Sequence, residues 1–310
     1  DGQYLAYLRN RDEWDLLMVM ILASGKVHEL VGERSLLPPA WVQGMRTIAW
    51  APTSDALYFL ENQQAMTRLN RVELESGQIT SLPMEQFTHI EQISVSPEGE
   101  VALIAQSPEL PAEIWRLKSS ALQLVASNQP NLAGTGWAPQ PQPVSWQSSD
   151  GATVYGTYYA PTNPHCSAEG LPPLIVYVHG GPTSQATVGF SLDRLFFTSR
   201  GYAFLEVNYR GSTGFGRSYR EALRHNWGRL DMQDTVEGAQ AMVALGLADP
   251  RKLVVKGSSA GGFTVLNALI HYPGVFKAGL CSYGVSNLFT LAMDTHKFEA
   301  HYNDFLVGQL

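Results

Sequence analysis

The fold of the second half of the chain is decided by the stretch Leu253-Val254-Val255-Lys256-Gly257-Ser258-Ser259-Ala260-Gly261-Gly262-Phe263. Its first three residues are apolar and predict a strand, whereas the apolar residues after Gly261 have the spacing of an amphipathic helix. Glycine stands two positions before and two positions after Ser259, and in a strand-turn-helix context this pattern presents a serine hydroxyl above a sheet. Side chains at 257 or 261 would collide in so sharp a turn. Ser259 is therefore the predicted nucleophile, with an ordinary loop rich in glycine and serine as the alternative.

Four short apolar runs, separated by stretches of helical length, are typical of a mostly parallel sheet covered on both faces. The runs are Leu174–Val178, Ala203–Val207, Leu253–Val255 and Ala278–Ser282. The candidate helices are Leu192–Ser199, Asp231–Leu245 and Gly262–His271. A predicted hairpin precedes them, Val144–Gln147 with Thr153–Tyr159. We expect residues 144–310 to form an α/β-hydrolase catalytic domain that is incomplete at its C-terminus.

A serine nucleophile needs N–H groups that bind an oxyanion, one from the residue after the serine and one from an earlier loop. The loop Val178-His179-Gly180-Gly181-Pro182 meets this need, because glycine leaves a backbone N–H uncovered. We expect Ala260 N–H and Gly181 N–H to be the donors, with Gly180 as the alternative second donor. His179 precedes the serine, whereas the base follows it in α/β-hydrolases, so a structural or site-lining role is favoured over catalysis.

The first part of the chain repeats a turn that leads into a strand. These strands begin at Tyr4, Ala56 and Val101, and the turns recur at spacings of 53 and 44 residues (1 to 54 and 54 to 98). Such spacings are typical of four-stranded propeller blades, whose stacking around an axis buries sheet faces that one copy leaves bare. We expect residues 1–126 to be the C-terminal blades of an incomplete β-propeller, with an ordinary antiparallel meander as the alternative. Residues 127–143 are the expected linker, because their prolines would interrupt a strand ladder.

Two further motifs suggest a ligand only at first sight. Gly211-Ser212-Thr213-Gly214-Phe215-Gly216 reverses the glycine order of a dinucleotide-binding turn and lacks the Lys-Ser/Thr of a P-loop, so a loop beside the site is expected. His296 and His301 are five positions apart, which on a helix is about 140° around the axis and too far to share an ion. Asp294 and His296 precede the strands that should carry the triad acid and base. No metal and no cofactor is expected.

The composition argues against several classes of protein. Lys plus Arg number 21 and Asp plus Glu 28, a net charge of −7 without a basic cluster, so nucleic acid is not an expected partner. No apolar run reaches the length of a membrane span, and no membrane partner is expected. The two cysteines, Cys166 and Cys281, cannot build a disulfide framework and fit a reducing compartment, so a cytoplasmic location is expected.

Taken together, the motifs resemble the prolyl oligopeptidase family of serine peptidases, in its branch of acylaminoacyl-peptidases and dipeptidyl aminopeptidases. The resemblance rests on Val178–Pro182, Asn208–Gly216, Trp227-Gly228 with Asp231 and Asp234, Gly257–Thr264, and Asp294–Glu299. It implies a propeller that screens an α/β-hydrolase domain, an acyl-enzyme on Ser259, and His179 and Tyr209 as lining residues of the substrate site. It also implies short peptides as substrates, cleaved either by an acylaminoacyl or dipeptidyl aminopeptidase or by an oligopeptidase. Some members carry a tyrosine at the position of His179 whose hydroxyl joins the oxyanion hole, so a backbone-only hole is expected here.

The resemblance places the triad acid and base beyond Leu310 and the first blades before Asp1. The 310-residue chain by itself is therefore expected to be inactive. Two other functions stay open: a carboxylesterase with the same acyl-transfer chemistry, and a propeller interaction module with a relic hydrolase fold. The propeller favours a peptidase over an esterase, and the intact elbow and glycine loop argue against a relic. The chain could act as a monomer or as a homo-oligomer.

Overall fold

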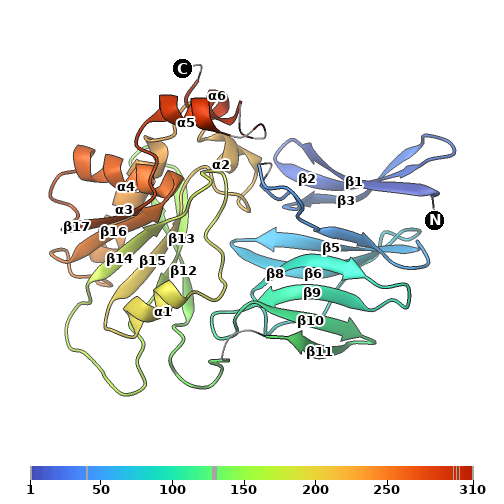
Figure 1. The fold of residues 1–310 in the computed structure, drawn as a ribbon, viewed down its shortest axis with the longest axis horizontal. Coiled ribbons are helices and arrows are strands. Elements are labelled where there is room, and N and C mark those ends of the chain that lie inside the picture. Colours follow the sequence, from blue (N-terminus) through green and yellow to red (C-terminus); the bar gives the residue numbers. More distant parts are fainter. Residues whose placement is uncertain are drawn as a thin grey trace. The chain divides into compact units, whose positions relative to one another are not determined.

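The computed structural model describes residues 2–39, 41–127, 131–295, 297, 299 and 301–308. The chain forms two compact units, coloured mainly blue to green and yellow to red in Figure 1. The first unit comprises Asp1–Asn131 and two short segments from later in the chain, Thr187–Phe190 and Gly214–Arg217. The second unit comprises Leu132–Ala186, Ser191–Thr213 and Ser218–Leu310.

The first unit consists of three antiparallel sheets that follow one another along the chain. The first sheet contains β1 (Tyr4–Arg11), β2 (Trp14–Ile21) and β3 (Val27–Arg34). The second contains β4 (Ile48–Trp50), β5 (Ala56–Gln63), β6 (Met66–Glu73) and β7 (Ile79–Ser81). The third contains β8 (His89–Val95), β9 (Val101–Gln106), β10 (Glu113–Lys118) and β11 (Ala121–Ala126). The three strands expected after the repeated turns thus begin at the expected residues, as β1, β5 and β9.

The alternation of side chains along β5 explains how the sheets stack. Leu57 and Phe59 are buried in one apolar cluster with Leu17 of the first sheet. Leu60 is buried in another cluster with Ile93 of the third sheet. Because neighbouring residues of a strand point to opposite faces, the middle sheet is covered on both faces.

His89, at the start of β8, is expected to make the stability of the first unit depend on pH. Its Nδ1 lies 2.8 Å from Thr67 Oγ1, and burial lowers the pKa of His89 from 6.5 to about 4. A histidine with a depressed pKa contributes stability that is present above the unfolded value and lost as the pH falls toward the folded value. Between pH 7 and pH 5, we expect the free energy of unfolding to fall by about 2 kcal/mol more in the wild type than in His89→Asn. Urea denaturation at both pH values measures this, and equal losses in the two proteins would contradict it.

The second unit is built on a six-stranded sheet with the order β12-β13-β15-β14-β16-β17. The strands are β12 (Pro141–Gln147), β13 (Thr153–Tyr159), β14 (Leu174–Val178), β15 (Ala203–Asn208), β16 (Leu253–Ser258) and β17 (Ala278–Ser282). β14 to β17 pair in parallel, and β12 and β13 pair antiparallel at one edge. The four apolar runs form the parallel part, as predicted, and the predicted hairpin forms the antiparallel edge.

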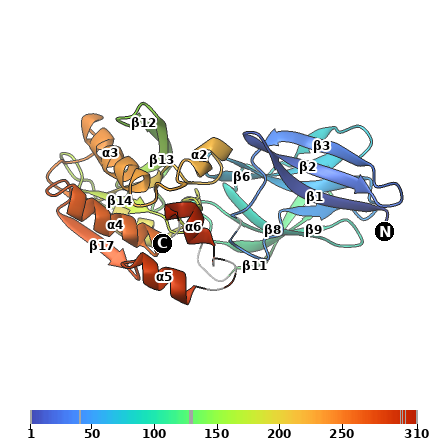
Figure 2. The ribbon, with the colours of Figure 1, turned by 90° about the horizontal axis from the view of Figure 1, so that it is seen from above.

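Helices cover both faces of this sheet (Figures 1 and 2). On one face, Val176 of β14 packs in a cluster with Val236 of α3 (Leu230–Ala244) and Val265 of α4 (Ala260–His271). On the other face, Ile175 packs in a cluster with Phe197 of α1 (Leu192–Thr198). Three further helices in the described residues were not predicted: α2 (Arg217–Glu221), α5 (Leu288–Asp294) and α6 (Tyr302–Val307). In the described residues, every helix is too short or too polar to cross a membrane.

The strand β12 differs from the expectation for its prolines. Pro141 and Pro143 were expected to interrupt any ladder, but both pair with β13, opposite Tyr159 and Thr157. The physical reason is that β12 lies at the edge of the sheet. A proline on an edge strand can direct its missing N–H away from the neighbouring strand, so no ladder bond is lost.

The two later segments of the first unit are held by main-chain hydrogen bonds. Val188 N–H donates to the carbonyl of Ala65 at 3.0 Å, and Arg217 N–H donates to the carbonyl of Glu13 at 2.9 Å. The first unit therefore takes part of its backbone from sequence that lies between strands of the other sheet.

Candidate active site

Ser259 lies at the junction of β16 and α4, where the sequence placed it. Its φ of 54° and ψ of −123° lie outside the helical and extended regions, and its side chain is exposed. A Cβ atom on Gly257 would lie 2.6 Å from the carbonyl carbon of Gly261, and one on Gly261 would lie 2.9 Å from the carbonyl oxygen of His179. The close approach of strand and helix thus requires glycine at both positions, for the reason expected from the sequence.

The backbone of Ser259 is hydrogen-bonded, whereas its hydroxyl is available for reaction. Its N–H donates to the carbonyl of Ser282 at 3.2 Å, and its carbonyl accepts from Val285 N–H at 3.2 Å. Within the described parts of the chain, neither Ser259 Oγ nor Ala260 N–H has a hydrogen-bond partner. Ala260 is the first residue of α4, where N–H groups lack intrahelical acceptors and carry the positive end of the helix dipole. An oxyanion beside Ser259 would meet this N–H.

The glycine loop after β14 lies against this turn. A Cβ atom on Gly180 would lie 3.5 Å from Ser259 Cβ and 4.0 Å from Ala260 N. Gly181 has a φ of 123°, which side-chain-bearing residues rarely adopt, and a Cβ there would lie 2.8 Å from Ser184 Cβ. The structure therefore brings Gly180, Ser259 and Ala260 together, with Gly181 next in the chain.

His179 orients the peptide group between Gly180 and Gly181. Its Nδ1 lies 2.7 Å from Gly180 O, and its Nε2 lies 2.7 Å from Ser212 Oγ. A carbonyl oxygen can only accept, so Nδ1 carries the proton and Nε2 accepts from Ser212. Because the C=O and N–H of a trans peptide point in opposite directions, Gly181 N–H points away from His179.

The same contacts leave His179 unable to act as a base for Ser259. Burial lowers the pKa of His179 to about 4, so the ring is neutral at pH 7, and both nitrogens are already hydrogen-bonded. Tyr209 stacks on the ring at a centroid distance of 4.4 Å and donates its hydroxyl to Pro182 O at 2.8 Å. Both side chains are buried beneath the glycine loop. For His179 this is the structural role that the sequence left open beside a site-lining one, whereas for Tyr209 it differs from the expectation that it lines the substrate site. Their contacts support the loop.

Two other supports of the glycine loop escaped the sequence reasoning. Ser212 belongs to the motif interpreted only as a loop beside the site. Its polar side chain, four residues after the end of the buried strand β15, was the available signal. Tyr302, on α6, accepts a hydrogen bond from Thr183 N–H at 2.9 Å, and its hydroxyl lies 2.5 Å from Thr183 Oγ1. Nothing in the sequence around Tyr302 indicated this contact.

The segment that carries Tyr209 and Ser212 is anchored by a buried arginine. Arg210 forms ion pairs with Asp234 at 2.6 Å and with Asp150 at 2.5 Å. These carboxylates and the desolvated guanidinium hold the end of β15 in place, so the hydroxyl of Ser212 meets His179 from a fixed backbone.

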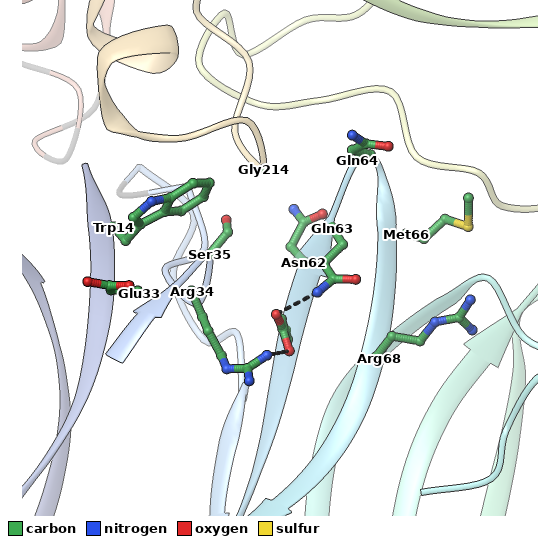
Figure 3. Close-up of a pocket in the computed structure, with 11 residues that line it drawn as sticks. Trp14, Glu33, Arg34, Ser35, Asn62, Gln63, Gln64, Met66, Arg68 and Gly214 are labelled. Carbon is green, nitrogen blue, oxygen red and sulfur yellow. Dashed lines mark hydrogen bonds and ion pairs between the residues drawn. The ribbon is translucent and has the colours of Figure 1, made fainter. Parts of the chain in front are cut away.

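A separate cavity of about 480 Å³ lies in the first unit (Figure 3). Arg34 and Glu61 form an ion pair in it at 2.6 Å, and Gln63 donates to the same carboxylate at 2.7 Å. Trp14 and Gly214 also contribute to its lining. None of the site residues predicted from the sequence lines this cavity.

The histidine pair considered as a metal motif is only partly described. His296 lies outside the described residues, and His301 is exposed, with Nδ1 3.1 Å from Asp304 Oδ2. Among the side chains that the structure describes, no group of three His, Cys, Asp or Glu residues could hold a metal ion.

The parallel sheet with a serine at a sharp strand-to-helix turn, beside a glycine loop, defines the second unit as an α/β-hydrolase fold. Residues 188–309 match the model of the prolyl oligopeptidase family. The match agrees with the family that the motifs predicted.

Individual relatives agree with this assignment. Dipeptidyl aminopeptidase BIII of Pseudoxanthomonas mexicana is 31% identical over 208 residues, which are 65% of this chain and 30% of that protein. A puromycin-hydrolyzing peptidase of Mycobacterium tuberculosis has a structure with a TM-score of 0.92 and 32% identity, over 100% of this chain and 47% of that one. A crystal structure of puromycin hydrolase has a TM-score of 0.88 and 32% identity, over 96% of this chain and 45% of that one. The chain thus spans less than half of the length of these relatives.

Proposed function

We propose that this chain is part of a serine peptidase that hydrolyses short peptides through an acyl-enzyme on Ser259. The hydroxyl oxygen attacks the carbonyl carbon of the scissile bond, and the negative charge on the carbonyl oxygen is met by Ala260 N–H and Gly181 N–H. The C–N bond then breaks, the amine leaves with a proton, and water releases the acyl group from the serine. The acid and base that move these protons are expected outside residues 1–310.

The geometry of Ser259 carries this proposal. Its exposed hydroxyl sits on a strained turn, with a free N–H from Ala260 and a glycine loop beside it. His179 holds the carbonyl of Gly180, and this contact directs Gly181 N–H away from His179. The contact therefore favours Gly181 over Gly180 as the second oxyanion donor. The relatives act on short substrates by name, and a puromycin hydrolase variant has been crystallised with PGG.

The three sheets of the first unit are, in this proposal, blades of a β-propeller. Their similar meander order and the covering of both faces of the middle sheet support the assignment. We keep the predicted blades (1–126) and catalytic domain (144–310), together with the expected cytoplasmic location. The predicted linker (127–143) is shortened, because β12 begins at Pro141.

Chromogenic acyl-peptide, dipeptidyl and ester substrates test the function on the full-length protein. We expect release of the amine from at least one of the two peptide classes, and loss of this activity in Ser259→Ala. Which peptide class is cleaved distinguishes release of blocked residues from release of dipeptides. Cleavage of esters without any cleavage of amides would instead identify a carboxylesterase.

A further inference from the structure

The first turn of α4, which carries the predicted nucleophile and oxyanion donor, is tied to a buried carboxyl group. Asp231, in the first turn of α3, is fully buried. Its Oδ2 accepts a hydrogen bond from the hydroxyl of Thr264, and its Oδ1 accepts one from Gly228 N–H at 2.6 Å. The carboxyl group thus joins three segments: the turn before α3, α3 itself, and α4.

Thr264 connects this carboxyl group to the backbone of the active-site turn. Its hydroxyl also lies 3.3 Å from the carbonyl oxygen of Ala260, one helical turn back. Thr264 is fully buried, so water cannot replace either contact. The path from Asp231 to Ala260 therefore runs through a single hydroxyl group.

The surroundings of Asp231 are closely packed, and its charge favours a strong hydrogen bond. Trp227 packs on Phe263 of α4 with ring centroids 4.8 Å apart, and a Cβ atom on Gly228 would lie 2.8 Å from Phe263 Cε1. Desolvation raises the pKa of Asp231 to about 6, so the group is ionised at pH 7. A hydrogen bond from a neutral hydroxyl to a buried carboxylate is stronger than one between neutral groups.

We propose that Asp231 and Thr264 are positioning residues for Ser259 and Ala260, which hold the first turn of α4 in the orientation that the oxyanion requires. The inference rests on the proposed function of Ser259. Neither side chain touches the reacting atoms. Their effect on the reaction is to fix the direction of Ala260 N–H and the place of Ser259 Oγ, and small displacements of such groups are costly to rate.

The test compares two buried threonines in the full-length protein. Thr264→Val removes the hydroxyl that donates to Asp231 and lies 3.3 Å from the carbonyl oxygen of Ala260. Thr235→Val is the matched control, because Thr235 is equally buried. Within the described residues its hydroxyl donates only to the backbone carbonyl of Asp231, at 2.6 Å. We expect Thr264→Val to lower kcat about 10-fold to 100-fold, as for groups that orient a reacting group, with KM within about twofold. Thr264→Ser should restore most of the loss, and Thr235→Val should stay within about twofold of the wild type.

A second readout separates positioning from stability. A peptide aldehyde forms a tetrahedral adduct with the serine and uses the oxyanion donors, whereas the matching peptide amine product does not. We expect Thr264→Val to weaken aldehyde binding about 10-fold or more and to leave product binding unchanged. Asp231→Asn keeps the shape of Asp231 but removes its charge, and it should weaken aldehyde binding by a smaller factor. This variant replaces Thr264→Val in the test if Thr264→Val does not fold.

The outcomes distinguish this inference from the proposed function. Equal kcat and aldehyde affinity in Thr264→Val and Thr235→Val, with Ser259→Ala inactive, would overturn the positioning role alone. Full activity of Ser259→Ala would overturn the proposed function itself. A parallel loss of aldehyde and product binding in Thr264→Val would show a merely structural role and would also overturn the inference.

Discussion

Replacing Ser259 by alanine is expected to lower kcat of the full-length protein by about 10⁶-fold, the scale of removing the nucleophile of a serine peptidase. The reason is that no acyl-enzyme can form without the hydroxyl, and only the oxyanion donors and substrate binding remain. The measurement is peptide hydrolysis, combined with labelling by a fluorophosphonate and mapping of the labelled peptide by mass spectrometry.

Ser258 provides a matched control for this experiment. It precedes Ser259 directly, lies at the end of β16 and pairs with Ser282 of β17. Ser258→Ala should retain labelling and most of the activity. Labelling at any other residue, or turnover by Ser259→Ala near the wild-type level, would disprove the assignment of the nucleophile.

The second large effect is expected for Gly181→Val, which should lower kcat about 100-fold or more, the scale of losing one oxyanion donor. A valine would be strained at the φ of 123°, and its Cβ would lie 2.8 Å from Ser184 Cβ and 2.9 Å from Ser184 N. The loop must shift to relieve these contacts, and the N–H of residue 181 then loses its direction. Steady-state kinetics with a peptide substrate measures the change.

Gly246→Val controls for the backbone strain alone. Gly246 also has a positive φ, 71°, but a Cβ there would meet no atom within 4 Å. Both variants should lower the melting temperature, whereas only Gly181→Val should lower kcat. A correctly folded Gly181→Val protein with unchanged kcat would remove this loop from the mechanism.

The nucleophile turn could be predicted from sequence because its constraint is local. Glycine is required at 257 and 261 because a side chain there would collide with backbone atoms of the same turn or of the end of the neighbouring strand β14. The support by Asp231 was not predictable in the same way. It depends on Thr264, 33 positions away, and the sequence does not show that the two side chains meet.

The direction in which a side chain points was a second property that the sequence did not predict. The sequence placed His179 and Tyr209 near the active site, but burial and hydrogen bonding turn both beneath the loop. A sequence motif shows which loop a residue belongs to, but it does not show on which face of that loop the side chain lies. Short elements such as α6 give no periodic signal, so Tyr302 was missed.

The two segments that the first unit takes from later sequence have a consequence for the order in which the protein is made. Synthesis on the ribosome releases residues 1–131 before the two later segments. Thr187–Phe190 follow only after β14 has been made, and Gly214–Arg217 only after β15. Domains that are continuous in sequence can fold as units during synthesis. Here the nascent first unit must wait for residue 188 before Ala65 can accept its backbone hydrogen bond, and for residue 217 before Glu13 can.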